Sequence, residues 1–100
     1  MAINDRWRTL GRDAAPEAAG VYELGDRSGA VIYIGSSGNL QRRIAEHASA
    51  PANTCIGQWA AAFRYETTIA YEAREKQLFR QYKATHGGRI PPCNDRDPSA

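Results

Sequence analysis

Residues 20–35 read GVYELGDRSGAVIYIG, and this stretch decides the fold. Its first part, 20–24, holds β-forming residues, and 25–29 is a cluster of Gly, Asp and Ser typical of a turn. β-Forming residues resume over 30–34, so the stretch predicts an antiparallel hairpin. The second strand is almost wholly apolar, so we expect both of its faces to be covered and the strand to lie in the centre of a sheet.

The residues after the hairpin predict a helix and then a loop. Residues 35–39, Gly-Ser-Ser-Gly-Asn, are expected to break the second strand and to offer N-cap candidates. Apolar residues then recur at helical spacing over 40–50, and Pro51 ends the helix. Residues 51–58 predict a loop.

The rest of the chain predicts a third strand and a longer helix. Apolar and polar residues alternate over 63–67, which indicates a strand with one polar face. A helix is expected from Ile69 to about His86, where a Gly-Gly pair ends it. Residues 1–19 predict an irregular or partly helical lead-in, and 95–100 a polar, frayed tail.

Length and composition fit one domain with one core. The chain has 100 residues, of which 42% are hydrophobic. We therefore expect residues 1–100 to form a single α+β domain, a small three-stranded, mainly antiparallel sheet flanked by helices. A separate recognition domain is not expected, so the same surface would have to bind and act on any target.

Charge, hydropathy and cysteine usage argue against three classes of protein. A net charge of +2 is not the footprint of a dedicated nucleic-acid binder. The longest apolar runs fall short of the ~20 residues that span a bilayer, and the N-terminus lacks a signal peptide, so we expect a cytoplasmic protein with no membrane contact. Cys55 and Cys93 have no CxxC spacing and no close His, so we expect two reduced thiols and no zinc site.

One carboxylate lies on the apolar face of the longer predicted helix. At about 100° per residue, four apolar or aromatic side chains fall within about 60° of Glu75: Tyr71, Leu78, Phe79 and Tyr82. A carboxylate in that position is costly unless it is paired or binds a cation. A buried salt bridge with an Arg and a metal ligand are therefore both open interpretations.

The shorter predicted helix carries an Arg and a His on one face. Arg43 and His47 are four residues apart, at the edge of the apolar stripe, whereas Arg42 and Glu46 point away. A guanidinium and an imidazole directed together at the sheet could hold a phosphate. The alternative is a helix edge packed on the sheet, with His47 bonded to a backbone carbonyl.

Two tyrosines on the paired strands add to these residues. Tyr22 and Tyr33 alone would predict core side chains whose hydroxyls reach the surface. Together with an Arg, a His and a Glu on elements that must pack against each other, they indicate a functional site.

The order of these motifs resembles the GIY-YIG nuclease family. Gly20-Val21-Tyr22, followed after ten residues by Tyr33-Ile34-Gly35, is similar to the motif pair that defines the family. Residues 36–47 resemble its loop and first helix, with Arg43 in the usual place. A His four residues after this Arg is similar to the arrangement in phage homing endonucleases.

Two further motifs extend the resemblance to roughly residues 18–94. Residues 75–79 resemble the segment that carries the family's metal-binding carboxylate, and Asn94 matches the Asn that closes the domain. The stretch before Glu75 departs from the family, because it lacks the usual apolar run and contains Glu72 instead. The position of Glu75 on the apolar stripe favours it over Glu72 as the carboxylate.

The resemblance implies an endonuclease that hydrolyses phosphodiester bonds in DNA with one divalent cation, Mg²⁺ or Mn²⁺. Glu75 would be the metal ligand, and Arg43 would neutralise charge that develops on the phosphate. Tyr22 would accept a proton from the attacking water or orient it, and Tyr33 would complete the hydrogen bonding around the phosphate. His47 is an alternative general base, and the choice between it and Tyr22 stays open.

The substrate is less well defined by the sequence. Single-stranded or structured DNA is favoured, RNA is not excluded, and a protein partner could direct specificity. The alternatives are a non-catalytic nucleic-acid-binding module and a partner-binding domain whose polar groups form structural salt bridges. Candidate substrate-binding residues are Gly35, Ser36, Ser37, Asn39, Arg42 and Asn94.

Overall fold

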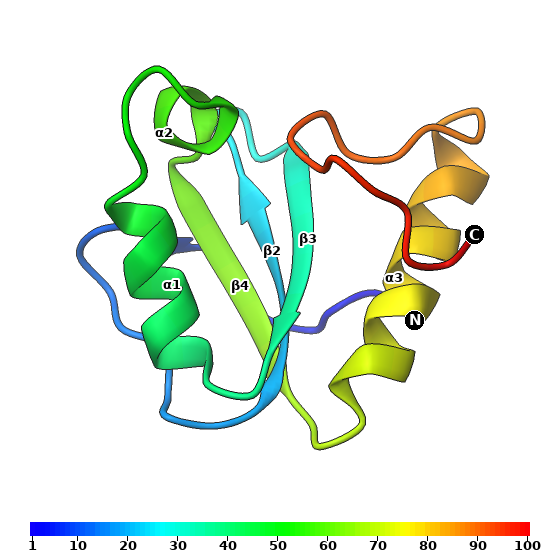
Figure 1. Cartoon of the computed structure of the whole chain (residues 1–100), viewed down its shortest axis with the longest axis horizontal. Helices are drawn as coiled ribbons and strands as arrows, with labels where there is room; N and C mark the ends of the chain where they lie inside the picture. The colour runs from blue at the N-terminus through cyan, green and yellow to red at the C-terminus, as the bar shows by residue number, and fades with distance from the viewer.

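A computed structural model describes all residues, 1–100. The domain contains one antiparallel sheet (Figure 1). The hairpin pairs β2 (Gly20–Gly25) with β3 (Val31–Ser37). The other side of β2 pairs with β4 (Ala62–Thr67), which in turn pairs with the short β1 (Arg8–Thr9). The strand order is therefore β1-β4-β2-β3, with β2 inside the sheet and β3 at its edge.

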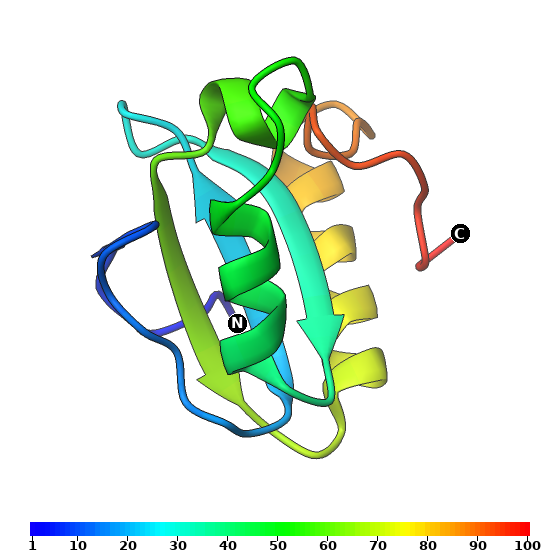
Figure 2. The ribbon, with the colours of Figure 1, turned by 60° about the vertical axis from the view of Figure 1, so that its left-hand side comes forward.

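Helices cover both faces of this sheet. Figure 2 shows α1 (Leu40–Ala48) in front of the sheet and α3 (Tyr71–Thr85) behind it. Asn39 is the N-cap of α1, and a third, one-turn helix, α2, spans Cys55–Trp59. No helix is long and apolar enough to cross a membrane. The predicted α+β class, with an antiparallel sheet flanked by helices, is confirmed.

Each face of the sheet carries its own part of the core, because successive side chains of a strand point to opposite faces. A register shift between β2 and β3 interrupts this alternation at Ile32. On the α1 face lie Ala15, Tyr22, Leu24, Ile32, Leu40, Ile44 and Phe63. On the α3 face lie Ile3, Val21, Ile34, Leu78 and Phe79. The two neighbours Val21 and Tyr22 therefore anchor β2 to opposite layers.

The structure corrects two predictions about β3. The strand lies at the edge of the sheet rather than in its centre, and its apolar character comes from contact with α1 on one face and α3 on the other. The strand also continues through Gly35, Ser36 and Ser37, where a break was expected. These three residues pair with Tyr22, Val21 and Gly20 of β2, and this pairing extends the ladder.

Two short elements were not predicted from the sequence patterns. β1 adds a fourth strand to the three that were predicted, and α2 lies partly within the predicted loop. Each is too short to show a hydrophobic period. The side chain of Thr54 caps α2 by accepting a hydrogen bond from the backbone N–H of Gly57.

The expectation of two reduced thiols is wrong, because Cys55 and Cys93 form a disulfide. They are 38 residues apart in the chain, but the fold brings their Cα atoms within 5.5 Å. The bond joins α2 to the C-terminal segment beside β3. Disulfides are rare in cytosolic proteins, so this bond is unusual for the cytoplasmic protein that the apolar runs and the N-terminus predict.

Candidate functional site

Tyr22 and His47 form the buried centre of the candidate site. Tyr22 is 1% exposed, and its hydroxyl lies 2.7 Å from Nε2 of His47 on α1. Burial, helped by the charge of Arg43, lowers the pKa of His47 from 6.5 to about 4, so the imidazole is neutral at neutral pH. Burial raises the pKa of Tyr22 well above its ordinary value of 10. Two neutral groups therefore share this hydrogen bond, and the His47 side chain does not bond a backbone carbonyl, as the alternative expected.

Tyr33 completes an aromatic group with these two residues. Its ring centroid lies 6.0 Å from that of Tyr22 and 5.1 Å from that of His47. Gly35, the partner of Tyr22 on β3, makes the arrangement possible. A Cβ at Gly35 would lie 2.4 Å from both Cζ and the hydroxyl oxygen of Tyr22, so the ring occupies the space that any other residue would need.

Arg43 lies at the solvent-exposed side of this group. Its side chain is 48% exposed and donates a 3.4 Å hydrogen bond to Glu46, which turns back toward it instead of pointing away. The positive charge of Arg43 adds to the lowering of the pKa of His47 and opposes part of the rise that burial causes in the pKa of Tyr22. Since an exposed ion pair of this kind contributes little free energy, the guanidinium is available to an incoming anion.

Glu75 projects from α3 on the other side of β3, half-buried, as its place on the apolar stripe predicts. The Ser36 hydroxyl donates to its carboxylate at 3.0 Å, and none of the ion pairs in the structure includes Glu75. The alternative of a buried salt bridge is therefore wrong. The neighbouring Arg74 pairs instead with Glu66 of β4, at 2.8 Å.

A hard cation fits the surroundings of Glu75. Burial raises the pKa of the carboxyl group, and the charge of Glu72 adds to the rise, while the Ser36 hydrogen bond opposes it. A carboxylate that is desolvated and has no cationic partner gains from a bound metal ion. No group of three or more His, Cys, Asp or Glu residues surrounds it, so an ion here would keep water ligands, as Mg²⁺ usually does.

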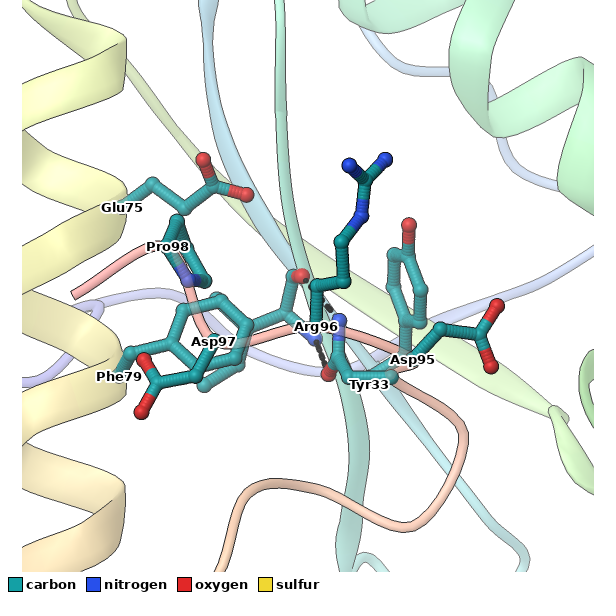
Figure 3. Close-up of a pocket in the computed structure, with 9 residues that line it drawn as sticks. Tyr33, Glu75, Phe79, Asp95, Arg96, Asp97 and Pro98 are labelled. Carbon is teal, nitrogen blue, oxygen red and sulfur yellow. Dashed lines mark hydrogen bonds between the residues drawn. The ribbon is translucent and has the colours of Figure 1, made fainter. Parts of the chain in front are cut away.

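A cleft of about 400 Å³ lies between β3, α3 and the C-terminal segment (Figure 3). Its walls contain Glu75 and Tyr33, the one from α3 and the other from β3. The remaining lining residues are Ile34, Phe79, Asn94, Asp95, Arg96, Asp97 and Pro98. The cleft thus joins the predicted metal ligand to the aromatic group around Tyr22.

The C-terminal segment contacts the domain at several points, one of them within residues 95–100, for which a frayed tail is predicted. The Asn94 side chain accepts a hydrogen bond from the N–H of Ile34 and donates one to its C=O, both at 3.0 Å. Asp97 pairs with Lys83 of α3 at 2.6 Å. The local sequence does not predict these contacts, because in each of them the two residues are far apart in the chain.

The six candidate substrate-binding residues are not equivalent in the structure. Gly35 and Ser36 contact the proposed catalytic side chains, and the Arg42 side chain is exposed on α1. The Ser37 hydroxyl bonds the backbone of Asn39, whose side chain caps α1. The polar groups of Ser37, Asn39 and Asn94 are therefore used within the fold. Arg96 also lines the cleft but is not among the six, because it lies in the segment predicted to be frayed.

This chain is similar to several known proteins. A family described as "Domain of unknown function (DUF7508)" matches residues 1–85. The UvrABC system protein C of Methylococcus capsulatus is 36% identical to this chain over 73 residues, which are 66% of the chain but only 12% of that protein.

Solved structures of the GIY-YIG N-terminal endonuclease domain of UvrC from Thermotoga maritima are also similar. A point mutant bound to its catalytic divalent cation has a TM-score of 0.57 and 25% identity, over 82% of this chain and 88% of that one. The magnesium-bound form has a TM-score of 0.55 and 25% identity, over 80% and 86%. These similarities support the likeness to GIY-YIG domains that the motifs predict.

Replacing Gly35 by Ala should disturb the site from within. The added Cβ must displace the Tyr22 ring, which is buried and has no free space to move into, so we expect a loss of about 1–3 kcal/mol in the free energy of unfolding. Gly38→Ala is the matched control, because its Cβ would meet only Tyr71 at 3.6 Å. Urea unfolding of the two variants measures the difference; equal stabilities would contradict the close packing of Tyr22 on Gly35.

The lowered pKa of His47 predicts a dependence of stability on pH. Between pH 6.5 and about 4 the folded imidazole stays neutral while the unfolded chain takes up a proton, so the free energy of unfolding falls as the pH falls through this range. His47→Gln removes this contribution. The stability of the wild type relative to His47→Gln, measured by urea unfolding at several pH values, should therefore decrease from pH 6.5 to 4. A constant difference would show that His47 titrates normally.

Proposed function

This chain belongs to the DUF7508 domain family, and we propose that it is a metal-dependent endonuclease that hydrolyses phosphodiester bonds in DNA. The observation that carries the proposal is Glu75, a half-buried carboxylate without a cationic partner in the cleft that also contains Tyr33. The similar UvrC domain, an endonuclease domain, binds its catalytic divalent cation. Since the chain spans 12% of the UvrC relative, the proposal concerns the activity of this domain alone.

Glu75 is proposed to hold one Mg²⁺ or Mn²⁺ ion. When bound, such an ion supplies a Lewis acid that polarises the phosphoryl group and lowers the pKa of a coordinated water. The Ser36 hydroxyl orients the Glu75 carboxylate through its hydrogen bond. Glu72 is exposed on the same helix and does not line the cleft, which supports Glu75 as the ligand.

Tyr22 and His47 are proposed to move the proton of the attacking water together. The raised pKa of Tyr22 disfavours a free phenolate, so the phenol would take the water proton only while passing its own proton to His47. The hydroxyl oxygen of Tyr22 then binds the new proton, and Nε2 of His47 receives the old one. The negative charge of a bound phosphate raises the pKa of the imidazole and so favours this transfer.

Arg43 and Tyr33 are proposed to bind the phosphate. Arg43 can exchange its exposed contact with Glu46 for a phosphate oxygen and would stabilise the charge that develops there during hydrolysis. Tyr33 lines the cleft and would donate its phenolic hydrogen to the same group. Arg42, which precedes Arg43 on α1 and is exposed, would contact the nucleic-acid backbone farther from the reacting bond.

Single-stranded or structured DNA is the proposed substrate. The cleft of about 400 Å³ accommodates one strand more readily than a duplex. A net charge of +2 gives the domain little general attraction for a duplex, and we propose that a protein partner directs it to a particular target.

The function is tested by cleavage of single-stranded, duplex and branched DNA and of RNA, with Mg²⁺ or with EDTA. We expect wild-type protein to cut single-stranded or branched DNA only with the metal. Glu75→Gln should abolish cleavage while the fold stays intact or is slightly stabilised, because a desolvated charge is removed.

Glu72→Gln, one turn earlier and exposed, is the matched control and should keep its activity. Full activity of Glu75→Gln would overturn the metal assignment. DNA binding without any cleavage by the wild type would instead identify a non-catalytic nucleic-acid-binding module.

The proton path is tested by Tyr22→Phe and His47→Ala. Tyr22→Phe keeps the packed ring, and we expect it to slow cleavage by at least ~10²-fold, the low end for general-base catalysis. His47→Ala should cost less, because water can replace the imidazole as the proton acceptor. Tyr65→Phe is the control, because Tyr65 lies on β4 and its hydroxyl does not bond His47. Normal cleavage by Tyr22→Phe together with an inactive His47→Ala would assign the base to His47 alone.

A further inference from the structure

The C-terminal segment is fixed to the domain at successive points along one wall of the cleft. The N–H of Cys93 donates to the C=O of Ile32 at 2.9 Å, and the Cys93 side chain is bonded to Cys55. Asn94 bonds both backbone groups of Ile34, and Asp97 pairs with Lys83 on α3. Residues 95 and 96 thus lie between two anchored positions, Asn94 on β3 and Asp97 on α3. The segment lies beyond residues 1–85, which the family match covers.

The Arg96 side chain extends from this part of the segment into the cleft. In Figure 3 its guanidinium rises between the carboxylate of Glu75 and the hydroxyl of Tyr33, on the same side of the cleft as both. The structure gives Arg96 no ion pair and no side-chain hydrogen bond. The adjacent Asp97 is engaged by Lys83 and Ser99, which lower its pKa to about 2. The C-terminal segment therefore presents an unpaired guanidinium in the cleft that also contains the carboxylate of Glu75.

We propose that Arg96 is a substrate-binding residue that contacts a phosphate of the strand lying in the cleft. The inference rests on the proposed function, since the phosphate is the anion that a nucleic acid brings. A guanidinium binds phosphate oxygens through two parallel hydrogen bonds. With a cation held by Glu75, a phosphate between this cation and Arg96 balances the charges on both sides.

Arg96 and Arg43 would then hold the strand from two directions. Arg43 approaches from α1, on the face of the sheet that carries Tyr22, and Arg96 approaches from the C-terminal segment at the edge of β3. Two separate phosphate contacts fix the course of one backbone across β3. The ordered C-terminal segment is thus part of the substrate site.

The inference is tested by binding, which does not require cleavage. The affinity of a fluorescein-labelled single-stranded DNA oligonucleotide is measured by anisotropy in EDTA over a series of salt concentrations. Arg96→Gln should raise Kd about ten-fold or more and make the slope of log K against log salt shallower by about 0.7, the value for one lost phosphate contact on a single strand.

Arg80→Gln is the matched control. It removes the same charge from an exposed position on α3 that does not line the cleft, so its salt slope should equal that of the wild type. If Arg96→Gln and Arg80→Gln showed the same affinity and the same salt slope, the role of Arg96 would be overturned, but the proposed function would not. Failure of the wild-type protein both to bind DNA in EDTA and to cleave it in Mg²⁺ would overturn the proposed function and the inference together, and binding without cleavage in Mg²⁺ would overturn only the catalytic part.

Discussion

The edge position of β3 is the constraint on which the candidate site depends. Side chains of a strand alternate between the two faces of the sheet, so Gly35 lies with Tyr22 toward α1, while Ser36 reaches Glu75 of α3. If β3 were a central strand, a further strand beside it would separate the side chains on the α1 face from those on the α3 face. At an edge they meet, and the only further cover is the C-terminal segment, which also lines the cleft.

The polar groups of the site divide into those that the fold satisfies and those that it leaves free. The Tyr22 hydroxyl is bonded to His47, and the Asn94 amide to the backbone of β3. By contrast, Glu75 has only a neutral hydroxyl as partner, and Arg96 has no side-chain partner. The unpaired carboxylate of Glu75 carries a desolvation cost because it is half-buried, whereas the guanidinium of Arg96 is exposed to water. They are consistent with a site that is completed by a cation and a phosphate.

The hairpin, both main helices and the α+β class could be predicted from the sequence, because each has a hydrophobic period over several residues. The same periodicity located Glu75 on the apolar stripe, and the spacing of Arg43 and His47 identified one helix face. The place of β3 in the sheet could not be predicted, since an apolar run also fits a central strand. The disulfide and the anchors of the C-terminal segment join residues far apart in sequence, and no local pattern reports such contacts.

A divalent cation on Glu75 is the central claim, and anomalous diffraction from crystals grown with Mn²⁺ and a short single-stranded DNA tests it most directly. The proposed site predicts one anomalous peak at about 2.1 Å from a carboxylate oxygen of Glu75, with its remaining ligands from water and phosphate. Crystals of Glu75→Gln should lack the peak. A peak on Glu72, or a wild-type cleft with bound DNA and no peak at Glu75, would contradict the claim.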